Sequence, residues 1–310
     1  MEKDIIVQVT RLSHRYASDW ALRDVNFELP NRGVYGLLGS NGAGKSTLMN
    51  ILCGVIKQTE GQVLIHGIDV LKSPILAKEC IGFLPQKPPL YGELTVEEYL
   101  HHAADIRNVA DKKIKEAIDE VLELCAISHF RKRLIKNLSG GYQQRVGIAQ
   151  AIIHKPEIVV LDEPTNGLDP GQILDVRRLI KKIAEERIVL LSTHILREVH
   201  AICEQILMIE RGRVVFSGTI NDFDHYLAPT TIYLSFVCPP SFGELERLEG
   251  VNRLEQLGEG KFRVFFSDAK EVMEHVVECS AKYRWRLSEM RMERGSLDDV
   301  FAELSHKSQS

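Results

Sequence analysis

Apolar and polar residues along this chain follow two different periods, and their order predicts the architecture. Three short runs are apolar throughout, at residues 34–38, 158–161 and 188–191. Such runs are typical of parallel strands that are buried on both faces. Three other stretches have the pattern of half-buried strands, at residues 4–10, 23–29 and 61–66. The pattern therefore predicts an α/β fold.

Between residues 95 and 129 the apolar period changes to that of a helix. Val96, Tyr99, Leu100 and Ala103 recur at the i, i+3, i+4, i+7 spacing of one helical face. A second face of this kind is formed by Ile114, Ala117, Ile118, Val121, Leu122 and Cys125. We therefore expect an all-helical insertion, from about residue 88 to residue 150, between two α/β halves.

The last part of the chain, residues 229–310, is predicted to form a separate small α+β domain after a first domain at 1–228. Strands are indicated at 232–237 and 261–266, helices at 242–248 and 270–283, and an extended segment at 284–290. We interpret the order as β-α-β-β-α-β, which suggests a ferredoxin-like fold. Ser296 and Asp299 have the spacing of a capping box at the start of a final helix, 297–304. Packing and dimerisation are the expected roles of this domain.

Composition narrows the class of protein. The chain has 310 residues, of which 44% are hydrophobic and 26% charged, as in ordinary globular proteins. No apolar run approaches the ~18 residues of a membrane-spanning helix, and the charged start at Met1-Glu2-Lys3-Asp4 predicts no signal peptide. The net charge of −4 gives no reason to expect a nucleic-acid partner. The six cysteines form no C-x-x-C pair, so reduced thiols in the cytoplasm fit best.

The most specific motif is a phosphate-binding loop. It reads Gly39-Ser40-Asn41-Gly42-Ala43-Gly44-Lys45-Ser46-Thr47 and matches G-x-x-x-x-G-K-[ST] without departure. A predicted strand precedes it and a predicted helix follows it, which is the context that the motif requires. Glycines let successive N–H groups converge on an anion, and the helix adds its positive end. Lys45 is placed to reach the β- and γ-phosphates, and the Ser46 hydroxyl to ligate Mg²⁺.

Two further residues have an ordinary and a functional interpretation. Tyr16 is expected in the loop between the strands 4–10 and 23–29, where it either packs locally or stacks on a purine base. Gln86 follows the strand that begins at Ile81 and ends in a Pro-Gln corner. It is either a surface amide or a neutral ligand for Mg²⁺ or the attacking water.

A second helix start carries Ser139, Gly140 and Gly141. Ser139 is a suitable N-cap for a helix that runs through Val146 to Ile153. The two glycines indicate close backbone approach. On its own this is a common helix start, but bare N–H groups at a helix N-terminus also form an anion site.

Acidic residues and a histidine follow two of the apolar strands. Asp162 and Glu163 end the strand 158–161, at the edge where α/β sheets place their chemistry. Asp162 is placed to hold Mg²⁺, and Glu163 is the candidate general base for a water. His194 ends the strand 188–191 and could pair with Glu163 or contact the γ-phosphate.

Together these motifs resemble the nucleotide-binding subunit of an ATP-binding-cassette (ABC) transporter, across roughly residues 4–220. They occur in the order of that family: aromatic loop (Tyr16), Walker A (39–47), Q-loop (Gln86), signature (138–143), Walker B (158–163), D-loop (167–169) and switch His194. The resemblance implies a P-loop NTPase cassette with a RecA-like core, an antiparallel β subdomain and an α-helical subdomain. The signature reads LSGGYQ where many members have LSGGQ, which leaves open the side chain that contacts the ribose.

The resemblance also implies partners and a place of action. Two cassettes would close head to tail, each ATP lying between the Walker A loop of one and Ser139 of the other, and hydrolysis would reopen the pair. The match is closest to the branch that serves multidrug, lipid, polysaccharide and sodium exporters with a separate membrane permease. The helical insertion and the loop after Gln86 would dock that permease at the cytoplasmic face of the cell membrane.

Two rival functions fit the sequence less well than transport. A soluble cassette that acts on ribosomes or nucleic acid usually carries two cassettes or long coiled coils, and this chain has a single cassette with about fifty residues between Gln86 and Ser139. An ATP sensor without turnover would lack the base, and Glu163 is present. The prediction is therefore an ATP-hydrolysing subunit that uses ATP and Mg²⁺.

Overall fold

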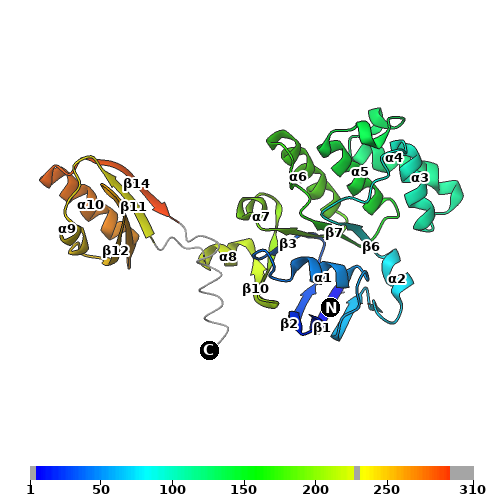
Figure 1. Cartoon of the computed structure of the whole chain (residues 1–310), viewed down its shortest axis with the longest axis horizontal. Helices are drawn as coiled ribbons and strands as arrows, with labels where there is room; N and C mark the ends of the chain where they lie inside the picture. The colour runs from blue at the N-terminus through cyan, green and yellow to red at the C-terminus, as the bar shows by residue number, and fades with distance from the viewer. Residues whose placement is uncertain (1–4, 227–230, 294–310) are drawn as a thin grey trace. The chain divides into compact units, whose positions relative to one another are not determined.

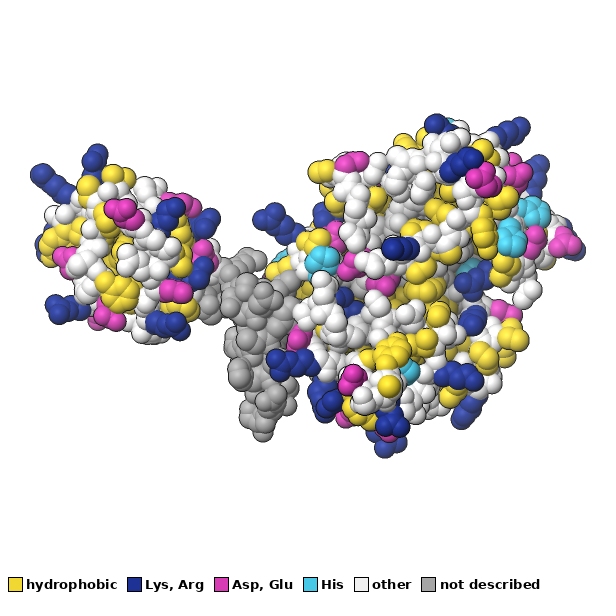
Figure 2. All heavy atoms as spheres, viewed as in Figure 1, with side chains coloured by type: hydrophobic (Ala, Val, Ile, Leu, Met, Phe, Trp, Pro, Cys, Tyr) yellow, Lys and Arg dark blue, Asp and Glu magenta, His cyan; other side chains and the backbone are white. Residues whose placement is uncertain are grey.

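The computed structural model describes residues 5–226 and 231–293, and it divides the chain into two units, 1–220 and 221–310. The first unit ends at Ile220, somewhat before the boundary expected at residue 228. Helices and strands of each unit are labelled in Figure 1, and charged side chains of both signs are spread over the surface (Figure 2). Within the described residues, no helix is both long enough and apolar enough to cross a membrane.

A six-stranded sheet forms the centre of the first unit. Its order is β10-β9-β3-β8-β7-β6, with every pairing parallel except the antiparallel pair of β9 and β10. The bounds are β3 Gly33–Leu38, β6 Ile81–Leu84, β7 Ile158–Asp162, β8 Ile188–Thr193, β9 Gln205–Glu210 and β10 Arg213–Thr219. All residues of β3, β7 and β8 are buried, as their apolar runs predict. Because β3, β8 and β7 are parallel neighbours, their carboxyl ends meet at one edge of the sheet.

The first unit also contains an antiparallel sheet with the strand order β2-β1-β4-β5. The bounds are β1 Val7–Tyr16, β2 Asp19–Leu29, β4 Glu60–Ile65 and β5 Ile68–Asp69. The loop expected between residues 10 and 23 is wrong, because β1 extends to Tyr16 and β2 begins at Asp19, which leaves a turn of only residues 17–18. Arg11 and Asp24 have positive φ angles of 47° and 49°, and the register of the pair shifts near both. These bulges interrupt the alternation of apolar and polar side chains along β1 and β2 without ending the strands.

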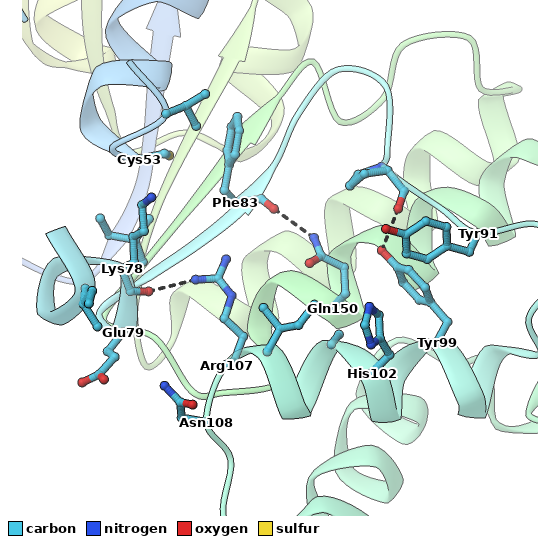
Figure 3. A pocket seen from close by; sticks show the side chains of 16 residues that line it. Cys53, Lys78, Glu79, Phe83, Tyr91, Tyr99, His102, Arg107, Asn108 and Gln150 are labelled. Atoms are coloured by element: carbon cyan, nitrogen blue, oxygen red, sulfur yellow. Dashed lines mark hydrogen bonds between the residues drawn. The ribbon is translucent and has the colours of Figure 1, made fainter. Parts of the chain in front are cut away.

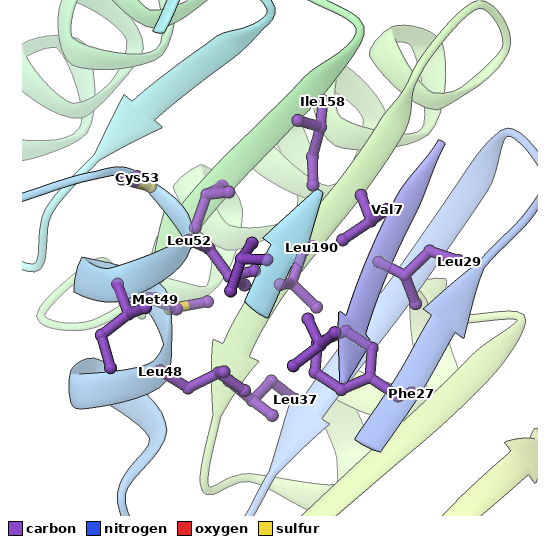
Figure 4. Packing of buried hydrophobic residues seen from close by; sticks show 14 of the residues in the cluster. Val7, Phe27, Leu29, Leu37, Leu48, Met49, Leu52, Cys53, Ile158 and Leu190 are labelled. Atoms are coloured by element: carbon purple, nitrogen blue, oxygen red, sulfur yellow. The ribbon is translucent and has the colours of Figure 1, made fainter. Parts of the chain in front are cut away.

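The core of the first unit lies between the two sheets and helix α1 (Lys45–Leu52). Leu48, Met49 and Leu52 of α1 pack with Leu37 and Phe27 of the two sheets (Figure 4). The opposite face of β3 is covered by α7 (Leu196–Ile202), whose Val199 lies against Gly36. α6 (Pro170–Ala184) packs on β3 and β8 as well. The central sheet is therefore covered on both faces, and its strand ends carry the exposed chemistry.

The insertion predicted between residues 88 and 150 is helical. It contains α3 Val96–Ile106, α4 Asp111–Leu124, short 3₁₀ turns at 128–130 and 135–137, and the start of α5 Gly140–Ile152. Thr95 and Glu98 form a capping box at the start of α3. The predicted apolar face of α4 is buried. Helix α2 (Pro74–Glu79) precedes this insertion, next to β6.

The second unit contains a four-stranded antiparallel sheet of order β12-β13-β11-β14. Its described elements after α8 (Ile220–Tyr226) are β11 Thr231–Phe236, α9 Phe242–Glu246, β12 Val251–Gly258, β13 Lys261–Phe266, α10 Ala269–Tyr283 and β14 Leu287–Glu293. This is a β-α-β-β-α-β order. Leu245 of α9 and Val272 and Val276 of α10 pack on the sheet residues Ile232 and Val264. The capping box at Ser296 and the helix 297–304 lie outside the described residues.

Candidate functional site

Residues 39–47 join β3 to α1 and form the phosphate-loop candidate. Gly44 precedes α1 with a φ angle of 110°, and a Cβ atom there would approach the carbonyl oxygen of Ala21 to 2.7 Å. Glycine therefore meets both a backbone and a packing requirement at this position. No side chain caps α1, so the N–H groups of its first turn remain available to an anion.

Lys45 is the buried cation of this loop. Its Nζ atom donates hydrogen bonds to the carbonyl oxygens of Gly39 at 2.7 Å and Ser40 at 2.9 Å. Burial lowers the pKa of Lys45, and the negative charges of Glu163, Asp162 and Glu210 act in the opposite direction. The ammonium group therefore lies inside the loop and within the field of the carboxylates at the strand ends.

Asp162 and Ser46 have the chemistry of a magnesium site. Asp162 is the last residue of β7 and is 8% exposed, while Ser46 is exposed in the first turn of α1. Among the described residues, no cluster of three or more histidine, cysteine, aspartate or glutamate side chains could hold a metal on its own. Mg²⁺ is commonly bound by one or two carboxylates, with phosphates and waters as the other ligands. One carboxylate and one hydroxyl beside a phosphate loop fit that requirement.

Glu163 is the centre of a polar cluster at the end of β7. Its Oε2 atom accepts hydrogen bonds from Gln86 Nε2 at 2.8 Å and from Asn166 Nδ2 at 3.0 Å, and its Oε1 atom lies 3.0 Å from His194 Nδ1. Glu163 also has a φ angle of +47°, a strained value for a residue with a side chain. The structure thus brings together Gln86, Glu163 and His194, which the sequence singled out separately.

Two members of this cluster were not identified from the sequence as functional. From the sequence, Asn166 is only part of a predicted tight turn, and its position three residues after Glu163 is the one available signal. Ser192 is only part of the segment that ends in His194. Its buried hydroxyl donates to Asp162 Oδ1 and accepts a hydrogen bond of 2.9 Å from the Glu163 backbone N–H.

A buried carboxylate supports the two loops that carry Glu163 and His194. Glu198 on α7 is 5% exposed and accepts hydrogen bonds from the hydroxyls of Thr165 and, at 2.7 Å, Thr193. Arg177 of α6 lies 3.8 Å from the same carboxylate. Thr165 follows Glu163 by two residues, and Thr193 directly precedes His194. Glu198 therefore links both segments through its hydrogen bonds to these two hydroxyls.

Helix α5 begins at Gly140, as predicted, with Ser139 at its N-cap position. The expected capping bond is absent: the Ser139 side chain accepts no hydrogen bond from the backbone N–H groups of the first turn. Its hydroxyl instead lies 3.5 Å from Gln172 Nε2 of α6. Without such a bond, the N–H groups at the start of this helix are uncapped, as they are in α1. Ser139 and Gly140 are also exposed.

Two tyrosines near these loops have different surroundings. Tyr16 is 52% exposed and has one edge-to-face contact, with His14 at 4.7 Å between ring centroids. Because so much of its ring is exposed, Tyr16 is better placed to stack on a purine base than to pack in the core. Tyr142 packs edge to face on Phe130 at 4.5 Å and lies under the guanidinium group of Arg145. Tyr142 is therefore held within the helical subdomain.

A separate cavity lies between α2, β6 and the helical subdomain. Its volume is about 490 Å³, and its lining includes Lys78, Tyr91, His102 and Arg107 (Figure 3). Arg107 donates a 2.9 Å hydrogen bond to the carbonyl oxygen of Lys78. Large apolar side chains at its rim are strongly exposed, namely Val55 at 58%, Ile75 at 72% and Ile106 at 64%.

Comparisons with known proteins identify the family and the fold that this chain resembles. Residues 22–166 match the model of the ABC transporter family. The bacitracin transport ATP-binding protein BcrA of Bacillus licheniformis is 38% identical over 233 residues, which cover 74% of this chain and 74% of that protein. The lipopolysaccharide export system ATP-binding protein LptB of Haemophilus influenzae is 34% identical over 218 residues, covering 69% of this chain and 90% of that protein.

A solved structure has the same fold over about two thirds of the chain. It is the dimeric post-hydrolysis state of the ATP-binding cassette MJ0796 with ADP and Pi. The TM-score is 0.63 at 26% identity, and the match covers 69% of this chain and 98% of that chain. The predicted α/β cassette fold is confirmed by these matches.

Proposed function

The chain belongs to the ABC transporter family, and from this premise we propose that it powers export through a separate membrane permease as a peripheral subunit at the cytoplasmic face of the cell membrane. It binds ATP and is an ATPase, as members of its family are. The observation that carries the ATPase role is the cluster around Glu163, which places a carboxylate with three polar partners beside the buried lysine of a phosphate loop, and the export role is supported by the transporter relatives.

ATP binding is assigned to the loop and the helix start after β3. The triphosphate would replace the carbonyl groups of Gly39 and Ser40 as the partner of Lys45, and the N–H groups of residues 40–47 would surround its oxygens. Tyr16 would stack on the base. Ser46, Gln86 and Asp162 would hold Mg²⁺, which would offset the negative charge of the phosphates.

Glu163 is assigned as the general base for the attacking water. The amides of Gln86 and Asn166 both donate to its Oε2 atom, which leaves Oε1 beside His194. A carboxylate whose one oxygen is fixed in this way presents the other in a defined direction, as general-base catalysis requires. His194 is exposed and would contact the γ-phosphate when the site is closed.

The uncapped helix start at Ser139, Gly140 and Gly141 is assigned to the nucleotide of a second cassette. Two identical chains related by a two-fold axis would satisfy both sites at once. The γ-phosphate would make these contacts only in the closed pair, so ATP would favour closure and hydrolysis would allow reopening. The dimeric form of the matching solved cassette supports this assignment.

The cavity between α2 and the helical subdomain is assigned to the permease. Ile75 and Ile106 expose most of their apolar surface at its rim, and exposed apolar patches commonly mark interaction sites. The cavity is also lined by Phe83 and Gln150, near the loop that carries Gln86. A segment bound there would be in a position to influence Gln86 and, through it, Glu163.

Purification from detergent-solubilised membranes tests this function. The tagged chain is expected to be recovered with a membrane protein, and recovery with ribosomes and no membrane protein would end the transport assignment. The double variant Ile75→Glu, Ile106→Glu is expected to lose the membrane protein and to keep its own ATPase activity. Val277→Glu, which replaces an exposed valine of the second unit, is the matched control and is expected to keep both.

A further inference from the structure

A single buried hydroxyl bridges the carboxylate of Asp162 and the backbone N–H of Glu163. Ser192 on β8 is completely buried. Its Oγ atom donates a hydrogen bond to Asp162 Oδ1 and accepts one of 2.9 Å from the backbone N–H of Glu163. Asp162 and Ser192 are paired neighbours in the parallel ladder of β7 and β8, so the register of the sheet places the hydroxyl beside both residues.

The chemistry of the groups determines the direction of both bonds. The backbone N–H of Glu163 can only donate, so the Ser192 oxygen accepts this hydrogen bond. The hydroxyl proton of Ser192 is then the one donated to Asp162 Oδ1. Both bonds of this hydroxyl are therefore fixed, and neither is replaced by water because the residue has no exposed surface.

Each bond has a consequence for the site. The bond to Oδ1 fixes the orientation of the Asp162 carboxylate, so that Oδ2 is the oxygen outside this contact. The bond to the Glu163 N–H holds a residue whose φ angle of +47° is unfavourable for a side chain. Gln86 and His194 contact the Glu163 carboxylate. Asn166 contacts this carboxylate and also donates its backbone N–H to the Glu163 carbonyl oxygen at 3.1 Å. Ser192 contributes the hydrogen bond to the backbone N–H of Glu163.

We propose that Ser192 is a positioning residue for ATP hydrolysis, which orients the metal-binding aspartate and the base through one hydroxyl. This inference depends on the proposed function, because it takes the roles of Asp162 and Glu163 from it. Partners that orient metal ligands typically change metal affinity or activity by about 10- to 100-fold when they are removed. Loss of the Ser192 hydroxyl is thus expected to raise the Mg²⁺ concentration that the enzyme needs and to lower its turnover as well.

The test uses the purified full chain and two readouts. In Ser192→Ala, the Mg²⁺ concentration that gives half-maximal ATPase activity is expected to rise about 10-fold or more, and kcat at saturating Mg²⁺ is expected to stay below the wild-type value. The gain in affinity for a fluorescent ATP analogue between EDTA and Mg²⁺ is expected to shrink by a similar factor. Ser192→Thr keeps the hydroxyl and is expected to stay within about 3-fold of wild type in both readouts.

A matched variant separates positioning from general stability. Ile188→Val removes one methylene from a fully buried residue of the same strand, and it is expected to lower Tm without moving the Mg²⁺ midpoint. If Ser192→Ala does not fold, Ser192→Cys takes its place, because a thiol is a weak donor of similar size. A Mg²⁺ midpoint and an affinity gain equal to those of Ile188→Val would overturn the proposal.

Two reference variants separate this inference from the function on which it depends. Asp162→Asn and Glu163→Gln are expected to lose most ATPase activity. If they hydrolyse ATP as the wild type does, the proposed roles of both carboxylates are wrong. If they lose activity while Ser192→Ala keeps the wild-type Mg²⁺ midpoint, only the role of Ser192 is wrong.

Discussion

Glu163→Gln is the substitution that most sharply separates ATP binding from hydrolysis. The glutamine carbonyl oxygen can still accept the hydrogen bonds that Gln86 and Asn166 now donate to Oε2, at 2.8 and 3.0 Å. The variant therefore keeps the geometry of the site and loses the proton acceptor. Loss of a general base typically lowers turnover about 10²- to 10⁴-fold, which corresponds to about 3–5 kcal/mol of transition-state free energy.

Binding of ATP is expected to persist in this variant. The substitution removes one of the negative charges that surround Lys45, so it also reduces repulsion of the triphosphate. Phosphate release by the purified chain measures turnover, and light scattering with ATP measures association into a closed dimer. We expect turnover at most about one hundredth of wild type and a stable ATP-dependent dimer.

A matched control distinguishes the base from its surroundings. Asn166→Ala removes one of the two donors to Oε2 and keeps the carboxylate, so its turnover is expected to fall only about tenfold, the effect of one hydrogen bond to a charged group. Turnover of Glu163→Gln within about threefold of wild type would refute the assignment of Glu163. Equal losses in both variants would show that orientation, and not proton transfer, is what the cluster supplies.

Three further substitutions test other parts of the account. Lys45→Ala removes the cation of the phosphate loop, so turnover is expected to fall about 10²-fold or more; normal ATPase activity would contradict the loop assignment. Glu198→Ala leaves two buried hydroxyls and Arg177 without their carboxylate, and chemical denaturation is expected to show a loss of about 3 kcal/mol, whereas a loss below about 0.5 kcal/mol would exclude a supporting role. Burial lowers the pKa of His154 from 6.5 to about 4. The folded chain therefore binds fewer protons than the unfolded chain between these values, and the free energy of unfolding should fall by up to about 3 kcal/mol as pH drops from 6.5 to 4. His154→Gln is expected to flatten this dependence, and an unchanged pH profile would contradict it.

Much of the site was predictable because its chemistry lies at strand ends. The strand before the phosphate loop and the strands before Asp162 and His194 are continuous apolar runs, and their parallel pairing brings these ends to one edge of the sheet. The phosphate loop fixes its own backbone through local glycines. For such residues the local sequence contains the cause of the structure.

The rest depends on contacts that the local sequence does not contain. Ser192 meets Asp162 only because β7 and β8 are neighbours in a given register, and no periodic pattern identifies one buried hydroxyl in an apolar strand. The predicted strands stop at residue 10 and start at residue 23, next to the bulges at Arg11 and Asp24 in β1 and β2, because a bulge disturbs the alternation of apolar and polar residues by which a strand is recognised. The cavity lined by Arg107 arises from the packing of segments far apart along the chain.

In the proposed mechanism, each nucleotide is held between two chains. A structure of the Glu163→Gln variant with Mg²⁺ and ATP tests it most directly. We expect a two-fold dimer in which each triphosphate contacts residues 39–47 of one chain and residues 139–141 of the other. A nucleotide-bound structure in which residues 139–141 contact no triphosphate in any assembly would contradict it.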